Sequence, residues 1–105
     1  MLFISYFELN ENSPFTTNLQ GAQKVMAAGL YPPTGVNIIR WDTTPDGWGV
    51  LIAEAESAES LFRAINVWRA AIPGFFKSVK TAPAMPIMEA IPLSTQIVQA
   101  LGGSS

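Results

Sequence analysis

Arg40 and Glu54 are the side chains of this sequence with the clearest capacity for chemistry. Residues 36–56 have the pattern of a β-hairpin, and its pairing places Arg40 diagonally across from Glu54. A guanidinium there could hold a carboxylate or an enolate, with Trp48 or Tyr6 as an apolar wall. The same two residues could instead form an ion pair that sets the register of a dimer interface, and we favour this structural interpretation.

Aromatic side chains are the second group of candidates. Trp41, Trp48 and Trp68 could line a pocket for a planar ligand, although tryptophan on a strand face or in a helical stripe more often belongs to the core. Tyr6 could donate a proton, but a strand tyrosine among aromatic neighbours usually packs. The candidate ligand-binding residues are Tyr6, Asn37, Arg40, Trp41, Trp48, Glu54 and Trp68. No catalytic residue and no metal ligand is assigned.

The composition excludes several kinds of site. The chain has no histidine and no cysteine, so imidazole and thiol mechanisms are excluded within one chain, and zinc, copper and haem lose their usual ligands. No Asp-rich loop has the spacing of a calcium site. We therefore expect no cofactor.

Charge and hydropathy limit the partners. The six Lys and Arg residues are scattered singly, so we expect no nucleic acid partner. No apolar run reaches the roughly 18 residues of a membrane span, and the N-terminal residues lack the features of a signal peptide. With 49% hydrophobic and only 13% charged residues, a soluble, cytoplasmic, self-associating protein is expected.

The order of elements predicts the fold. Apolar and β-branched runs predict strands at residues 2–9, 36–42 and 48–56, and helical periodicity follows Ser13-Pro14 and Ser57, each expected as a cap. The expected apolar stripes are Phe15, Leu19, Ala22, Met26 and Leu30 in the first helix, and Leu61, Ile65, Trp68 and Ile72 in the second. With a closing strand this is an α+β, ferredoxin-like βαββαβ fold, a four-stranded antiparallel sheet with two helices on one face.

Within the hairpin, a loop at 45–47 pairs Trp41 with Leu51 and Arg40 with Ile52. One face is then predicted to pack against the helices, namely Asn37, Ile39, Trp41, Gly49, Leu51, Ala53 and Ala55. The opposite face is too apolar for water, namely Val36, Ile38, Arg40, Asp42, Trp48, Val50, Ile52, Glu54 and Glu56. A second copy is the simplest cover, so we expect a homodimer through the exposed sheet face.

The C-terminal part leaves two possibilities. Either residues 75–81 or residues 84–91 close the sheet, and Pro86 restricts the latter to an edge or a strand start. We expect a ferredoxin-like unit at 1–82 and an extension at 83–105, which could contain an extra edge strand and a short helix at 93–101, as part of the same single domain.

Several stretches resemble a family of uncharacterised bacterial proteins, the domain of unknown function DUF3303, in the dimeric α/β-barrel superfamily. They are Met1-Leu-Phe-Ile, Pro32-Pro33-Thr34-Gly35-Val36, Arg40-Trp41-Asp42, residues 47–55 and the Trp68 position, within residues 1–75. The resemblance implies the fold and dimerisation. It transfers no catalytic residue, since that family has no assigned activity, and the chain departs from the pattern after Phe75.

Three functional hypotheses follow. The favoured one is a non-enzymatic homodimer that binds a partner or a small apolar or aromatic ligand. The alternative is a cofactor-independent monooxygenase or isomerase acting on an aromatic or polyketide-like compound, by analogy with that superfamily. An enclosed cavity of some hundreds of Å³ reached by Arg40 or Tyr6 would favour the enzyme. The third is an assembly role for the tail, residues 81–101, reaching a neighbouring subunit.

Overall fold

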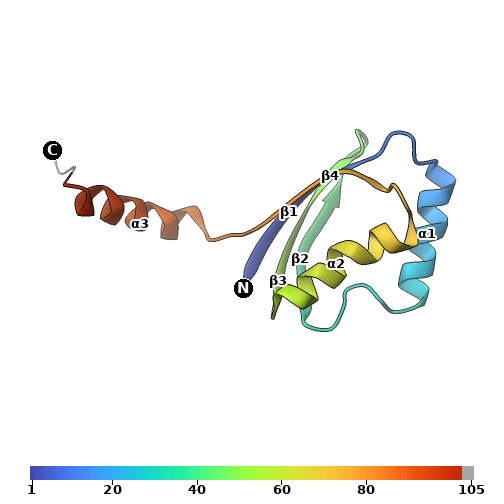
Figure 1. The fold of residues 1–105 in the computed structure, drawn as a ribbon, viewed down its shortest axis with the longest axis horizontal. Coiled ribbons are helices and arrows are strands. Elements are labelled where there is room, and N and C mark those ends of the chain that lie inside the picture. The colour runs from blue at the N-terminus through green and yellow to red at the C-terminus, as the bar shows by residue number, and fades with distance from the viewer. Residues whose placement is uncertain (103–105) are drawn as a thin grey trace.

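The computed structural model describes residues 1–102 and shows four strands and three helices (Figure 1). In chain order they are β1 (Leu2–Leu9), α1 (Phe15–Ala27), β2 (Val36–Thr43), β3 (Trp48–Ala55), α2 (Ala58–Ala71), β4 (Phe76–Pro83) and α3 (Ile87–Ala100). No helix in the described chain is both long enough and apolar enough to cross a membrane.

The sheet has the predicted ferredoxin-like topology. Its strand order is β2-β3-β1-β4, and every neighbouring pair is antiparallel. Helix α2 packs on one face of the sheet, and α1 packs against α2 on the same side (Figure 1). The sheet is closed by the first of the two candidate strands, at Phe76–Pro83. The second candidate is not a strand, because helix α3 begins at Ile87 directly after Pro86.

The hairpin register is confirmed next to the turn. Trp41 lies opposite Leu51 and Arg40 opposite Ile52. Gly47 has φ +78°, the left-handed conformation that the predicted turn requires of its last residue, and the Thr44 amide donates to the Trp48 carbonyl at 2.8 Å.

A β-bulge changes the faces at the other end of β2. The register shifts between Ile38 and Arg40, so Ile39 has no partner on β3. Val36 is therefore buried and Ile38 packs against the core, while Asn37 is exposed. The predicted faces of residues 36–38 were wrong, since one unpaired residue turns every side chain beyond it to the opposite face.

The core lies between α2 and the helix-facing side of the sheet. Trp68 stands at its centre, with its ring centroid 5.1 Å from that of Tyr31 and 5.6 Å from that of Trp41. The buried hydrophobic residues are Val25, Tyr31, Val36, Leu51, Ala53, Ala55, Ala64, Trp68 and Ile72. Ile72 and Trp68 confirm half of the stripe predicted for α2; Leu61 and Ile65 are only half-buried.

Helix α1 packs through small residues rather than through its predicted stripe. Its buried residues are Gly21 and Val25, whereas Phe15 is 77% exposed. A Cβ at position 21 would lie 2.1 Å from Cγ1 of Ile72, so glycine is what lets this helix approach the end of α2. The expected cap is also wrong: Pro14 occupies the N-cap position without a side-chain bond, and the Ser13 hydroxyl donates to the Asn18 side chain.

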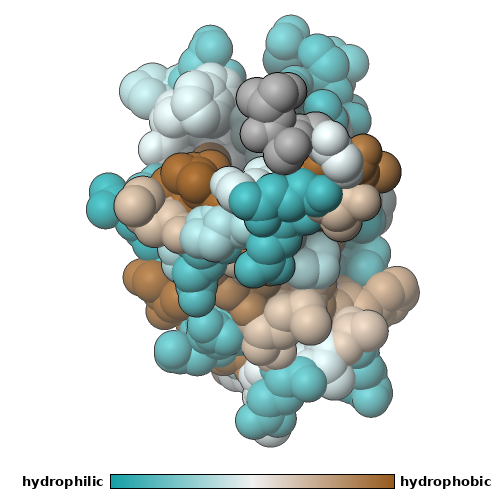
Figure 2. Space-filling view, turned by 90° about the vertical axis from the view of Figure 1, so that its left-hand side faces the viewer, coloured by the Kyte–Doolittle hydropathy of each residue, from teal (hydrophilic) through white to brown (hydrophobic). Residues whose placement is uncertain are grey.

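Residues 84–101, which we call the arm, extend away from the rest of the chain (Figure 1). The arm consists of a short linker and α3, which is longer than the predicted helix and has no buried residue. The described structure accordingly measures 58 × 29 × 18 Å. Seen from the arm end, hydrophobic side chains are exposed between hydrophilic ones (Figure 2). The arm therefore does not share the core of residues 1–83.

Candidate functional site

The seven predicted ligand-binding residues fall on opposite sides of the sheet. Tyr6, Asn37, Arg40, Trp48 and Glu54 lie on the face without helices, and Trp41 and Trp68 lie on the helix side. The structure thus divides the predicted set into two groups separated by the sheet, and these cannot line one pocket.

The expected ion pair between Arg40 and Glu54 is not formed. The Arg40 Nε atom donates to Oδ2 of Asp42, and this contact raises the pKa of the guanidinium. Glu54 Oε2 lies 3.3 Å from the N-terminal amine of Met1. Because of the bulge, Asn37 lies opposite Glu54, where the predicted register would have placed Ile38. Both ion pairs are solvent-exposed, so each contributes little to stability.

Tyr6 is engaged with its own strand. Its hydroxyl donates to Oε1 of Glu8 at 2.7 Å, and its ring lies 6.0 Å from that of Trp48. The hydrogen bond to Glu8 is the main cause that raises the pKa of the phenol. Tyr6 therefore keeps its proton in contact with a carboxylate, and its ring packs beside Trp48 on the face of the sheet without helices.

Apolar side chains run together across the face of the sheet that no helix covers. Ile4 pairs with Ile52, and Tyr6 pairs with Val50, across the central strands. Ile4 is 43% exposed and Trp48 39% exposed. We call this surface the open sheet face; its apolar residues are Leu2, Ile4, Tyr6, Trp48, Val50 and Ile52. It could bind a complementary apolar surface.

Trp68 is buried in a filled interior, and Trp41, which is 42% exposed, packs against it from the surface. The cavity beside them has a volume of about 30 Å³, which is the space of one water molecule. Tyr31, which the sequence reasoning did not single out, completes this cluster, and burial raises its pKa to about 12. Tyr31 and Trp68 therefore act as core, Trp41 covers them from the surface, and the small cavity beside them has no room for a planar ligand.

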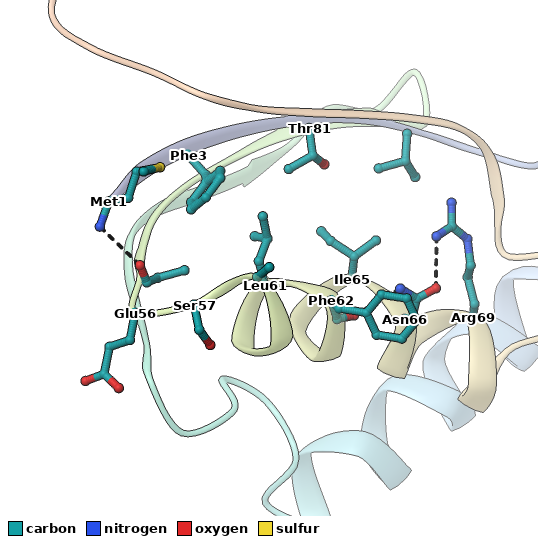
Figure 3. A pocket seen from close by; sticks show the side chains of 13 residues that line it. Met1, Phe3, Glu56, Ser57, Leu61, Phe62, Ile65, Asn66, Arg69 and Thr81 are labelled. Carbon is teal, nitrogen blue, oxygen red and sulfur yellow. Dashed lines mark hydrogen bonds between the residues drawn. The ribbon is translucent and has the colours of Figure 1, made fainter.

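A larger hollow lies along α2, above the β1 and β4 half of the sheet (Figure 3). We call it the groove; its volume is about 550 Å³. Leu61 and Ile65 point from α2 toward Phe3 and Thr81 on the strands. The full lining is Met1, Phe3, Ala55, Glu56, Ser57, Ala58, Leu61, Phe62, Ile65, Asn66, Arg69, Val79 and Thr81. Its walls are mostly apolar, and its volume is in the range of ligand sites.

One end of the groove carries a cation. Arg69 Nη1 donates to Oδ1 of Asn66 at 3.0 Å, and the guanidinium lies 5.4 Å from the centre of the Phe76 ring. The other end is closed by the N-terminal amine, which donates to the Ala55 carbonyl at 3.1 Å. The groove can hold an apolar body with an anionic group beside Arg69. Sequence reasoning missed it, although the extra apolar residue Phe62 beside the α2 stripe was a visible signal.

Within residues 1–102, no three His, Cys, Asp or Glu side chains are grouped to hold a metal ion. Comparison with protein-family models and with curated proteins finds no match to the sequence. The resemblance to the DUF3303 family therefore rests on the short stretches of residues that carry it.

Proposed function

We propose that the chain is a non-enzymatic module that dimerises through the open sheet face and binds a partner or an apolar ligand in the groove. The observation that carries the proposal is the uncovered row of apolar side chains on β1 and β3. Four strands of eight residues make a sheet of roughly 26 × 19 Å, about 500 Å² in plan. Because side chains project from the sheet, the accessible surface of this face is larger than its plan area and approaches the ~800 Å² that each partner buries in a stable interface.

The distribution of chemical groups supports a non-enzymatic role. Arg40 and Tyr6 lie on the open sheet face and bind neighbouring carboxylates, so neither reaches the groove or the interior cavity. The interior has room for about one water molecule. An enzyme of the monooxygenase or isomerase kind would need these residues around an enclosed chamber. Membership of the DUF3303 family and a cytoplasmic location belong to the same proposal, and the cysteine-free composition fits the latter.

Solution mass tests the interface. We expect a species of twice 11.3 kDa at micromolar concentration by light scattering after size exclusion. Ile52→Lys places a charge at the centre of the open sheet face, and should weaken the dimer at least tenfold. Gln23→Lys, on the exposed side of α1, is the matched control and should leave the mass unchanged. Far-ultraviolet circular dichroism checks that both variants fold. A folded wild-type protein that remains monomeric would overturn the proposal.

A further inference from the structure

The arm presents an apolar face, and no residue of α3 is buried in the described chain. Positions 87, 91, 98 and 101 recur at helical spacing, and positions 90, 93 and 97 widen the same face. Its exposed large hydrophobic residues are Met85, Ile87, Met88, Ile91, Leu93, Ile97, Val98 and Leu101. A 14-residue helix is marginal by itself in water, and Pro92 removes one internal hydrogen bond. The arm needs a partner surface.

The groove is similar in length to α3. Along α2 it extends from Ala58 to Arg69, which corresponds to roughly 17 Å of helix, and α3 is roughly 21 Å long. The groove lies between Leu61 and Ile65 on α2 and Phe3 and Thr81 on the strands (Figure 3), and it is open to solvent. A helix laid there would cover the part of β1 and β4 that α2 leaves bare, and would complete the helical layer.

The charged residues of α3 and of the groove are complementary as well. Glu89, in the first turn, is the only charged side chain of α3. Arg69 supplies a cation at one end of the groove, while the N-terminal ammonium and Glu56 lie at the other end. A docked arm with Glu89 near Arg69 would pair its one anion with the cation at that end.

The linker argues for the groove of a second copy rather than the arm's own groove. The Ala84 amide donates to the Leu2 carbonyl at 2.9 Å, so the chain still runs along β1 when β4 has ended. Pro83 and Pro86 hold their preceding residues extended, and the roughly 10 Å linker between β4 and α3 has no glycine to reverse direction. In Figure 3 the chain beyond β4 runs away from the groove.

We propose that α3 docks in the groove of a second copy, in a reciprocal exchange of arms. This deepens the proposed function, on which it rests for taking the groove as the binding site, by naming its occupant. Each large apolar side chain removes on the order of 60–120 Å² from water when it is buried. Two arms with six such residues each on this face would bury on the order of 700–1,400 Å², which reaches the lower part of the range of a standard interface, about 1,600 ± 400 Å².

Single-cysteine variants test the exchange, because the chain contains no native cysteine. Leu93→Cys in the arm is mixed with Thr81→Cys in the groove and treated with a bismaleimide that spans about 10 Å. Intact mass spectrometry should show the mixed dimer of the two variants as the main cross-linked product. The matched control replaces Thr81→Cys with Thr16→Cys on α1, which does not line the groove, and should give at least tenfold less mixed dimer.

Two further variants test the apolar face of the arm. Ile97→Glu should reduce the mixed cross-link at least tenfold, whereas Gln99→Glu, on the polar side of the same helix, should leave it unchanged. The near-ultraviolet circular dichroism, which arises from aromatic side chains that all lie within residues 1–83, should be unaffected by either change, since α3 has no buried residue.

Further outcomes test the exchange against its alternatives. A double variant, Thr81→Cys with Leu93→Cys, that cross-links only within one chain would show that the arm covers its own groove. No mixed product at all would show that the groove has another occupant, such as a small ligand. Repeating the mixture with Ile52→Lys in both variants separates the two proposals. A mixed cross-link that is retained supports the exchange independently of the sheet contact. A mixed cross-link that is absent from the original mixture, while the solution mass is still that of a dimer, overturns the exchange alone.

Discussion

Helices α2 and α3 are both 14 residues long and both carry an apolar stripe, but only α2 is covered. Trp68 and Ala64 of α2 are buried against the sheet, whereas α3 has no buried residue. The outer face of α2 is charged, and Arg63 donates to Glu59 at 2.9 Å one turn away. The polar side of α3 carries mainly uncharged residues and Glu89.

The comparison shows that α2 is stabilised by its own chain and α3 is not. Helix α2 begins at a serine cap, has Glu59 in its first turn and Arg69 in its last, and packs on a sheet. Helix α3 has no side-chain cap, no basic residue in its last turn and a proline inside it. Most helical stability in proteins comes from packing of the apolar face, so a helix with weak ends depends on that contact most.

The largest expected effect is on the core side of this comparison. Trp68→Ala should lower the free energy of unfolding by about 3–5 kcal/mol, because it opens a cavity among Tyr31, Trp41 and Phe75. Leu93→Ala in the arm is the control, and should change the stability of residues 1–83 by less than about 0.5 kcal/mol. Urea unfolding followed by circular dichroism at submicromolar concentration measures both. An equal loss in Leu93→Ala would show that the arm shares the core.

A smaller effect is expected at high pH. Burial raises the pKa of Tyr31 to about 12, so between pH 10 and 12 the unfolded chain releases this proton while the folded chain keeps it. Stability from this group is complete below pH 10 and falls as the pH rises, by about 2 kcal/mol in total. Tyr31→Phe keeps the ring and removes the titration.

The measurement is the difference between wild type and Tyr31→Phe in urea unfolding from pH 9 to 12. All other groups are the same in the two proteins, so their contributions cancel in the difference. Wild type should lose more stability than the variant over this range. Parallel curves for the two proteins would contradict the assignment of Tyr31 to the buried cluster.

The sheet could be predicted because strand pairing obeys a period of two. The apolar runs fixed the order of elements, and the Gly47 turn fixed the pairing of Trp41 with Leu51. The bulge at Ile39 could not be predicted, since Ile38 and Ile39 are both apolar and fall on opposite faces of a regular strand, so either assignment buries an isoleucine.

Helix packing was harder to predict for a similar reason. The large residues Phe15 and Leu19 suggested a buried stripe, but α1 approaches α2 so closely that only Gly21 and its small neighbours fit. The groove was missed because it depends on where α2 sits across the sheet, which no periodicity encodes. The predicted site residues were chosen by type, and the structure separates them because the sheet lies between Trp48 and Trp68.

The smallest expected effects concern the helix ends. The Ser57 hydroxyl accepts a hydrogen bond from the Ser60 amide at 3.1 Å, so Ser57→Ala should lower the free energy of unfolding by about 1 kcal/mol. The matched change on α3 adds a capping side chain instead of removing one. Pro86→Ser would place a hydroxyl three residues before Glu89, the spacing of a capping box.

If α3 is limited by its ends, Pro86→Ser should increase the helical signal at 222 nm without changing the unfolding midpoint of residues 1–83. Thr95→Ala, which removes a hydroxyl that donates to the Ile91 carbonyl within α3, is the control for a general change in helix propensity. An increase in the unfolding midpoint with Pro86→Ser would mean that capping α3 stabilises the core, and the two helices would then be energetically coupled.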